Sequence, residues 1–322
     1  MKKHLIAAAV AAAVAVPAMA QNVTISGRID TAIGSVDANN GTSATKMNSN
    51  TLTTNQIVIS GSEDLGGGLK ANFAILSPMN SDSNSTAFNF GGRGMLVGLS
   101  GAFGSIDLGR STGTHANAAV VTGGILGNAS PVNLGGAGFQ ARPDNSISYT
   151  SPTMNGFNVR VLHGLGAETD PNVGSQTEIS VSYKGGPLTV GVGFGQHDKT
   201  GAAGVDGDAD ETSAIVTYNM GFATVNARYL ALKFDNAAKE ATSGSKGWGL
   251  GVAVPLGNGL TAAIEYTDIN TKADADRTRI TAGLIKDLSK RTNVYAAAYK
   301  DSEKNSALED GSAYLIGVRH AF

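Results

Sequence analysis

The chain has 322 residues, with 24 Lys and Arg against 26 Asp and Glu, a formal net charge of −2 and no cysteine. This mildly acidic balance gives no reason to expect a nucleic-acid partner, because nucleic acids attract strongly basic domains. The lack of cysteine excludes disulfide bonds and thiol chemistry.

Residues 1–20 have the pattern of a secretory signal peptide. Two lysines precede an apolar run at 5–16, and Ala18-Met19-Ala20 matches the usual cleavage pattern of small residues. The run is shorter than the roughly twenty apolar residues that a membrane-spanning helix needs. We therefore expect export, cleavage before Gln21 and one mature domain over residues 21–322.

After this leader, apolar and polar residues alternate with period two in segment after segment. In one example, Val225, Ala227 and Tyr229 alternate with Asn226 and Arg228. One face of such a strand suits lipid and the other suits water. Only a closed sheet lets these strands cross a bilayer without unpaired backbone groups, so the pattern predicts an all-β, transmembrane antiparallel β-barrel.

Clusters of Gly, Asn, Asp, Ser and Pro divide the chain into about sixteen strands, an even number. Short connections such as 185–186 and 220–221 alternate with longer polar ones. This rhythm predicts a periplasmic rim of short turns and an extracellular rim of long loops. The predicted strands lie near 23–33, 55–62, 69–77, 93–100, 105–111, 145–151, 156–165, 176–184, 187–196, 212–219, 222–234, 246–255, 259–269, 277–287, 292–301 and 312–322.

A soluble β-sandwich or a secreted β-solenoid also alternates and also needs a signal peptide. It would place charged residues such as Arg228 and Glu265 on its outer surface, which the sequence permits. It explains poorly the long and short connections and the end of the chain on Phe322 within a strand. Both alternatives stay open at this point.

Several segments together resemble the general porins of Gram-negative bacteria, in the form common in Burkholderia, Bordetella and Neisseria relatives. The resemblance covers essentially the whole mature chain, and its most specific motif is Gly-Ser-Glu-Asp-Leu-Gly-Gly-Gly-Leu-Lys-Ala at 61–71. The other matching segments are 23–30, 97–110, 145–152, 288–295 and 317–322.

The resemblance implies a homotrimer of sixteen-stranded barrels in the outer membrane. Each barrel would fold its third extracellular loop, about 112–143, into the pore. The terminal Phe322 resembles the signal that the barrel assembly machinery recognises. The other expected partners are outer-membrane lipid and lipopolysaccharide, together with small hydrophilic solutes that cross by passive diffusion.

The charges around this loop favour a modest preference for small anions. No Asp or Glu occurs from Leu108 through Pro143, and charges that line a narrow pore select the ions that pass. Ionic screening should weaken the preference as salt rises. Gln56 and Ser60 stand where the family usually has arginines, and individual arginines can also be structural. The residues expected to line the pore or its constriction are Arg28, Asp30, Lys70, Arg110, His115, Arg142 and Arg160.

Other motifs do not predict an enzyme, a metal site or a cofactor. The acidic run 206–211 resembles a calcium loop, but Glu211 and Thr217 replace the Gly and Glu that an EF-hand requires. The histidines lack the context of a nucleophile elbow. The second hypothesis is a surface adhesin or receptor that uses the polar loops 36–55 and 197–210.

Overall fold

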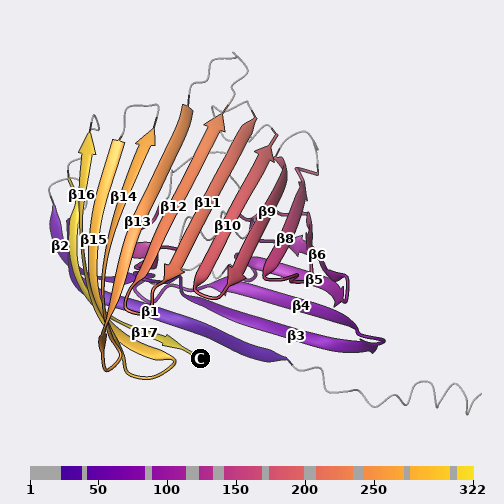
Figure 1. The fold of residues 1–322 in the computed structure, drawn as a ribbon, viewed down its shortest axis with the longest axis horizontal. Helices are drawn as coiled ribbons and strands as arrows, with labels where there is room; N and C mark the ends of the chain where they lie inside the picture. The colour runs from indigo at the N-terminus through magenta and orange to yellow at the C-terminus, as the bar shows by residue number, and fades with distance from the viewer. Residues whose placement is uncertain are drawn as a thin grey trace, which may run out of the picture.

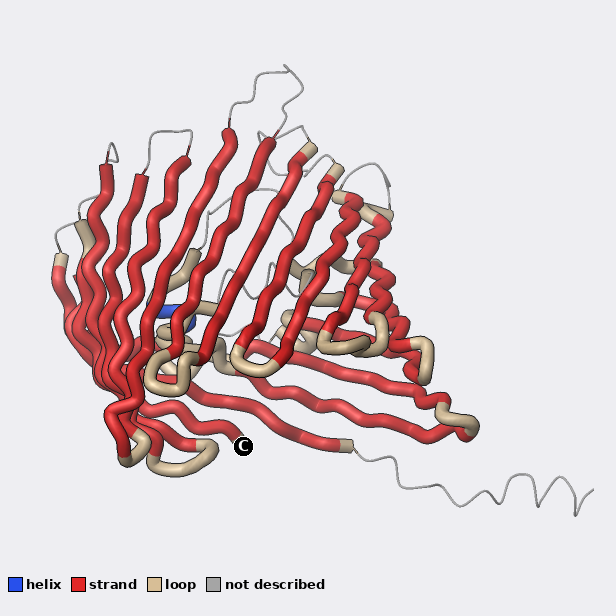
Figure 2. The backbone as a smooth tube through the Cα atoms, in the orientation of Figure 1, coloured by secondary structure: helices blue, strands red, loops and turns tan. Residues whose placement is uncertain are grey.

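The computed structural model describes residues 23–37, 42–83, 89–113, 123–132, 141–168, 174–198, 208–234, 243–271, 276–304 and 310–322. The predicted signal peptide lies outside the described residues. The strands found there all belong to one antiparallel sheet, and its only helix there is the 3-10 turn η1 (Gly127–Ala129) (Figures 1 and 2). None of the described segments forms a helix long and apolar enough to cross a membrane.

The strands are β1 (Thr24–Asp37), β2 (Ser43–Ser49), β3 (Gln56–Gly66), β4 (Leu69–Pro78), β5 (Gly94–Gly101), β6 (Gly104–Arg110), β7 (Ser146–Thr150), β8 (Phe157–Leu165), β9 (Ser175–Gly185), β10 (Leu188–His197), β11 (Ala209–Asn219), β12 (Thr224–Phe234), β13 (Ser243–Gly257), β14 (Leu260–Thr271), β15 (Asp276–Asp287), β16 (Thr292–Lys304) and β17 (Ser312–Ala321).

The sheet closes on itself where its last strand meets its first. β17 pairs with β1 from Ala321 opposite Arg28 to Ser312 opposite Asp37, and from β3 to β17 each strand pairs with the next one along the chain. A closed sheet has no free edge, so its backbone N–H and C=O groups are paired within the barrel. The predicted antiparallel barrel is confirmed.

Two of the strands share a single position in the barrel wall. β2 pairs with residues 31–37 of β1, and β3 pairs with residues 24–28 of the same strand. The barrel therefore has sixteen strand positions, as predicted. The sequence did not predict β2, because its polar residues do not alternate with apolar ones.

The connections differ between the two rims as the sequence predicted. Short turns lie at the rim that holds the C-terminus, and the strand ends that the longer connections join lie at the opposite rim (Figure 1). In the turn between β3 and β4, Gly66, Gly67 and Gly68 have φ angles of 85°, 61° and 81°. Glycine adopts such positive φ angles without the steric cost that other residues incur, which explains this cluster.

The two faces of the wall differ in polarity as the alternation predicted. On β9, Ile179 is 45% exposed on the outer face, whereas the preceding Glu178 is 1% exposed on the inner face. On β12, Tyr229 is exposed outside and Arg228 is buried inside. A soluble sandwich would bury its apolar side chains, so this arrangement contradicts that alternative and fits a wall that faces lipid.

We expect Val181→Arg and Ser182→Arg, on opposite faces of β9, to differ sharply in stability. Val181 is exposed on the outer face, and an arginine near the middle of the bilayer should cost about 2–4 kcal/mol. Ser182 faces inward opposite Gly191, so an arginine there should cost little. Denaturant unfolding in lipid vesicles measures both, and equal costs would contradict the assignment of the faces.

Candidate functional site

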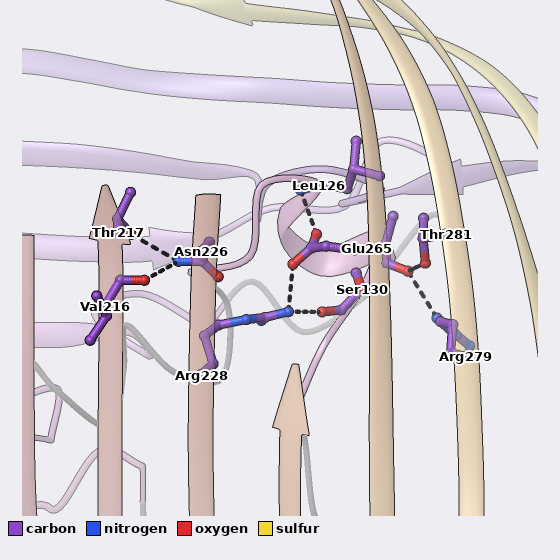
Figure 3. A network of polar contacts seen from close by, with 10 residues as sticks. Leu126, Ser130, Val216, Thr217, Asn226, Arg228, Glu265, Arg279 and Thr281 are labelled. Carbon is purple, nitrogen blue, oxygen red and sulfur yellow. Dashed lines mark hydrogen bonds and ion pairs between the residues drawn. The ribbon is translucent and has the colours of Figure 1, made fainter. Parts of the chain in front are cut away.

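The third long connection contributes a described segment, Gly123–Val132, that contacts the inner face of the wall. The backbone N–H of Leu126 donates to Glu265 Oε2 at 2.8 Å, and the carbonyl of Ser130 accepts from Arg228 Nη2 at 3.0 Å (Figure 3). All four of these residues are buried, and Glu265 comes from β14. Side chains on the inner wall therefore satisfy the backbone of this segment.

A buried ion pair lies beneath the segment. Arg228 Nη2 lies 2.6 Å from Glu265 Oε1, and both side chains are 0% exposed. These residues come from β12 and β14, on either side of β13. On β13, Gly249 is the register partner of Arg228 and Gly251 that of Glu265. A Cβ atom on Gly249 would lie 2.9 Å from Arg228 Nη2, so the inward glycines of β13 leave the space in which the pair meets.

A second charged pair holds the same segment one strand further on. Arg279 of β15 makes two parallel contacts with Asp301 of β16, at 2.5 Å and 2.6 Å. Its Nη1 also donates to the carbonyl of Ala129 at 3.1 Å, and its guanidinium lies 3.9 Å from the ring centroid of Tyr299. A bidentate arginine of this kind fixes geometry more strongly than a single contact. The turn η1 is thus attached to the wall at several points.

Apolar packing supplements these polar contacts. Leu126 and Ala129 are buried in one apolar cluster with inward-facing residues of the wall. A Cβ atom on Gly283 of β15 would lie 2.6 Å from Leu126 Cδ2, so the leucine depends on the glycine for space. The inward-facing wall residues of this apolar cluster are Ala32, Val36, Ala253, Ala263, Tyr295, Ala297, Ala313 and Leu315.

A second part of the interior carries positive charge. Arg93, in the turn before β5, donates from Nε to Gln56 Oε1 at 3.0 Å, and Arg28 Nε donates to the carbonyl of Thr54 at 2.9 Å. Burial, and then the positive charges of Arg142 and Arg28, lower the pKa of Arg93 to about 10. Burial is also the main reason that the pKa of Arg142 is lowered.

The basic cluster, which we define as Arg28, Arg93 and Arg142, is only half-buried. The inward-facing Gln56 beside it is also partly exposed. By contrast, the inner wall beneath η1 is buried. Solvent therefore reaches the interior on the side of the basic cluster, and three guanidinium groups that remain charged at neutral pH attract anions.

Two of the residues predicted to line the pore, Asp30 and Arg160, instead hold chain segments inside the barrel by hydrogen bonds. Asp30 is 0% exposed, and its carboxylate accepts from the backbone N–H groups of Leu52 and Thr53 at 2.7 and 2.6 Å. Arg160 is buried and donates to Ser111 Oγ and to the carbonyls of Thr112 and Gly113. Both charged groups are therefore hydrogen-bonded to chain segments inside the barrel.

The remaining predicted residues are spread over the molecule. Lys70 is exposed and shares the inward face with its register partner Ser100, close to the short-turn rim. Arg142 belongs to the basic cluster, as Arg28 does. His115 lies outside the described residues. Phe322 pairs its backbone N–H and C=O with Gly27 at 3.0 Å, and its role in assembly stays a prediction.

The placement of Arg110 corrects the expectation that it lines the pore. Its register partner on β5 is Met95, which is exposed on the outer face. Register partners share a face of the sheet, so the side chain of Arg110 leaves β6 on the outer face as well. It forms an ion pair with Asp144 at 2.6 Å and donates from Nε to the carbonyl of Gly92. Proximity to the third connection in sequence suggested a pore position, whereas strand parity gives the outer face.

The residues that sequence reasoning missed are those brought together by the closed wall. The inward parity of Arg228 and Glu265 was visible in the sequence, but their contact across β13 was not. The run Gly247-Trp248-Gly249-Leu250-Gly251 is the one available signal, because inward glycines indicate that neighbouring side chains need space. Arg93 lies in a turn, where strand parity gives no information.

Among the described residues, no group of three or more His, Asp or Glu side chains is arranged to hold a metal ion. The interior instead combines a wall in which charges are paired with a region in which positive charges face solvent. This arrangement can attract and pass charged solutes.

We expect Glu265→Ala to lower the free energy of unfolding by about 3–5 kcal/mol, because Arg228 then loses the carboxylate beside its buried guanidinium. The double variant Arg228→Met with Glu265→Met should recover much of this loss, since it removes both charges. Denaturant titration of the folded barrel in vesicles measures the three free energies. A double variant that loses as much free energy as Glu265→Ala, or more, would argue against a coupled pair.

Comparison with known proteins agrees with this geometry. Residues 7–306 match the family described as Gram-negative porin. The chain is 31% identical to outer membrane porin protein 32 of Delftia acidovorans, with all of both chains covered. Its fold resembles the anion-selective porin from Comamonas acidovorans, with a TM-score of 0.83, 28% identity and coverage of 94% of this chain and 100% of that one. It also resembles a trimer form of OmpT from Vibrio cholerae, with a TM-score of 0.67, 16% identity and coverage of 94% and 100%.

Proposed function

Because the chain belongs to the Gram-negative porin family, we propose that it is a channel narrowed by its third long connection and selective for small anions. The protein is an outer-membrane porin through which small hydrophilic solutes diffuse passively. Family and fold point to a channel, and we assign it no catalytic step.

The narrowing is supported by the contacts of Gly123–Val132 with the inner wall. The segment is held by the Arg228–Glu265 pair and by Arg279, so it occupies space that an empty barrel would leave to water. A segment fixed at several points keeps the pore width constant while solutes pass.

The observation that carries the anion preference is the basic cluster of Arg28, Arg93 and Arg142. Burial and the charges of Arg142 and Arg28 lower the pKa of Arg93, whereas burial and the charge of Arg110 lower the pKa of Arg142. An anion beside the cluster offsets that repulsion, whereas a cation adds to it. The third connection offers no carboxylate from Leu108 through Pro143 to reverse the field.

We propose a homotrimer surrounded by outer-membrane lipid and lipopolysaccharide, supported by the apolar outer face and by the trimeric relative of this fold. Residues 1–20 act in this proposal as a cleaved leader, and Phe322 as the signal read by the assembly machinery.

Planar-bilayer recording tests the anion preference. Across a salt gradient, the zero-current potential should have the sign of anion preference and should shrink as salt rises, because the screening length is about 8 Å at physiological ionic strength. Arg93→Gln should weaken the preference, since it removes a charge from the basic cluster.

Lys290→Gln is the matched control, because Lys290 is an exposed residue of the short turn between β15 and β16. It removes the same charge away from the cluster and should leave the potential nearly unchanged. Cation preference in the unaltered protein at low salt would reject the proposal.

A further inference from the structure

The wall contains an insertion at the junction of β2 and β3. Six residues, 50–55, lie opposite only two residues of β1, Ile29 and Asp30, which have no register partner in β2 or β3. The chain thus carries four more residues here than a continuous ladder needs. Leu52 is 3% exposed and packs in the same apolar cluster as Leu126, so the extra residues turn into the barrel and not out of it.

Asp30 satisfies the groups that this insertion removes from the ladder. Its own N–H donates to Asn55 Oδ1 at 2.6 Å, in place of a backbone acceptor. Its carboxylate accepts from the N–H groups of Leu52 and Thr53, and also from the hydroxyl of Tyr295 across the barrel seam. A carboxylate with 0% exposure is tolerable only when donors surround it in this way.

The inserted segment also contacts the third connection. The N–H of Asn128 donates to the carbonyl of Leu52 at 3.0 Å, and Asn128 Nδ2 donates to the carbonyl of Asn50 at 3.0 Å. Gly127 has a φ of 55°, and a Cβ atom there would lie 2.0 Å from the carbonyl oxygen of Leu52. Such close backbone contact needs glycine, so the two segments fit together at this point.

The same segment positions an arginine of the basic cluster. The carbonyl of Thr54 accepts from Arg28 Nε at 2.9 Å, although Arg28 itself belongs to β1. Releasing the segment would therefore free the guanidinium as well as the space that the segment fills.

From these contacts we infer that Asn50–Asn55 is a second pore-narrowing element, with Asp30 as its positioning residue and Asn128 as its link to η1. This inference rests on the proposed narrowing by the third connection and adds a partner to it. The two segments lie against the inner wall from β12 to β1, and the passage runs beside the basic cluster, which the inserted segment contacts through Arg28. The segment sets the size limit of the channel, whereas the arginines set its charge preference.

The test compares Asp30→Ala with Asp107→Asn in vesicles, using uptake of neutral sugars from a monosaccharide to a trisaccharide. Asp30→Ala removes the acceptor that holds the segment, so uptake of the larger sugars should rise relative to the smallest one. Asp107 faces inward on β6, is half-buried and bonds to Ser105, away from the segment. Asp107→Asn removes the same formal charge and should leave the size limit unchanged.

Asn128→Ala provides a second route if Asp30→Ala does not fold. It removes only the side-chain contacts to Asn50 and Thr54 and should shift the size limit in the same direction by less. An unchanged size limit in every variant that folds would overturn the inference. Because neutral sugars do not report on charge, the result is independent of the anion preference, and an unaltered protein with no uptake at all would instead reject the narrowed channel itself.

Discussion

The structure depends on one constraint: backbone N–H and C=O groups that cross hydrocarbon must be paired within the protein. The seam between β1 and β17 meets it, because ten residues of each strand pair there and leave no edge. Once the sheet is closed, alternate residues of each strand are committed to lipid or to the interior. The apolar outer face and the polar inner face are both consequences of this closure.

The interior then has to accommodate chain segments and charges with limited water. Beneath η1, the Arg228–Glu265 pair and Asp30 have no exposure and are surrounded by partners, as buried charges require. In the basic cluster, Arg93 has an amide partner and two arginine neighbours. Paired charges hold the segments that narrow the passage, and the arginines of the basic cluster give the passage a positive electrostatic potential.

Much of the fold was predictable because a wall between lipid and water imposes a period of two on every strand. All sixteen predicted segments correspond to strands, with ends that differ by a few residues. The prediction failed where this rule does not operate. β2 lacks the alternation, Arg110 was assigned from its distance along the chain to the third connection, and Arg93 lies in a turn.

The sequence alone determined the barrel, the inward or outward parity of residues such as Arg228 and Tyr229, and the absence of acidic residues from the third connection. Only the tertiary structure decided which inward charges meet. Arg228 and Glu265 are 37 residues apart and separated by β13, and Asp30 meets Tyr295 through the seam. Alternation is a local property of each strand. These contacts depend instead on the register between strands and on how the barrel closes, and no single segment of the sequence determines either one.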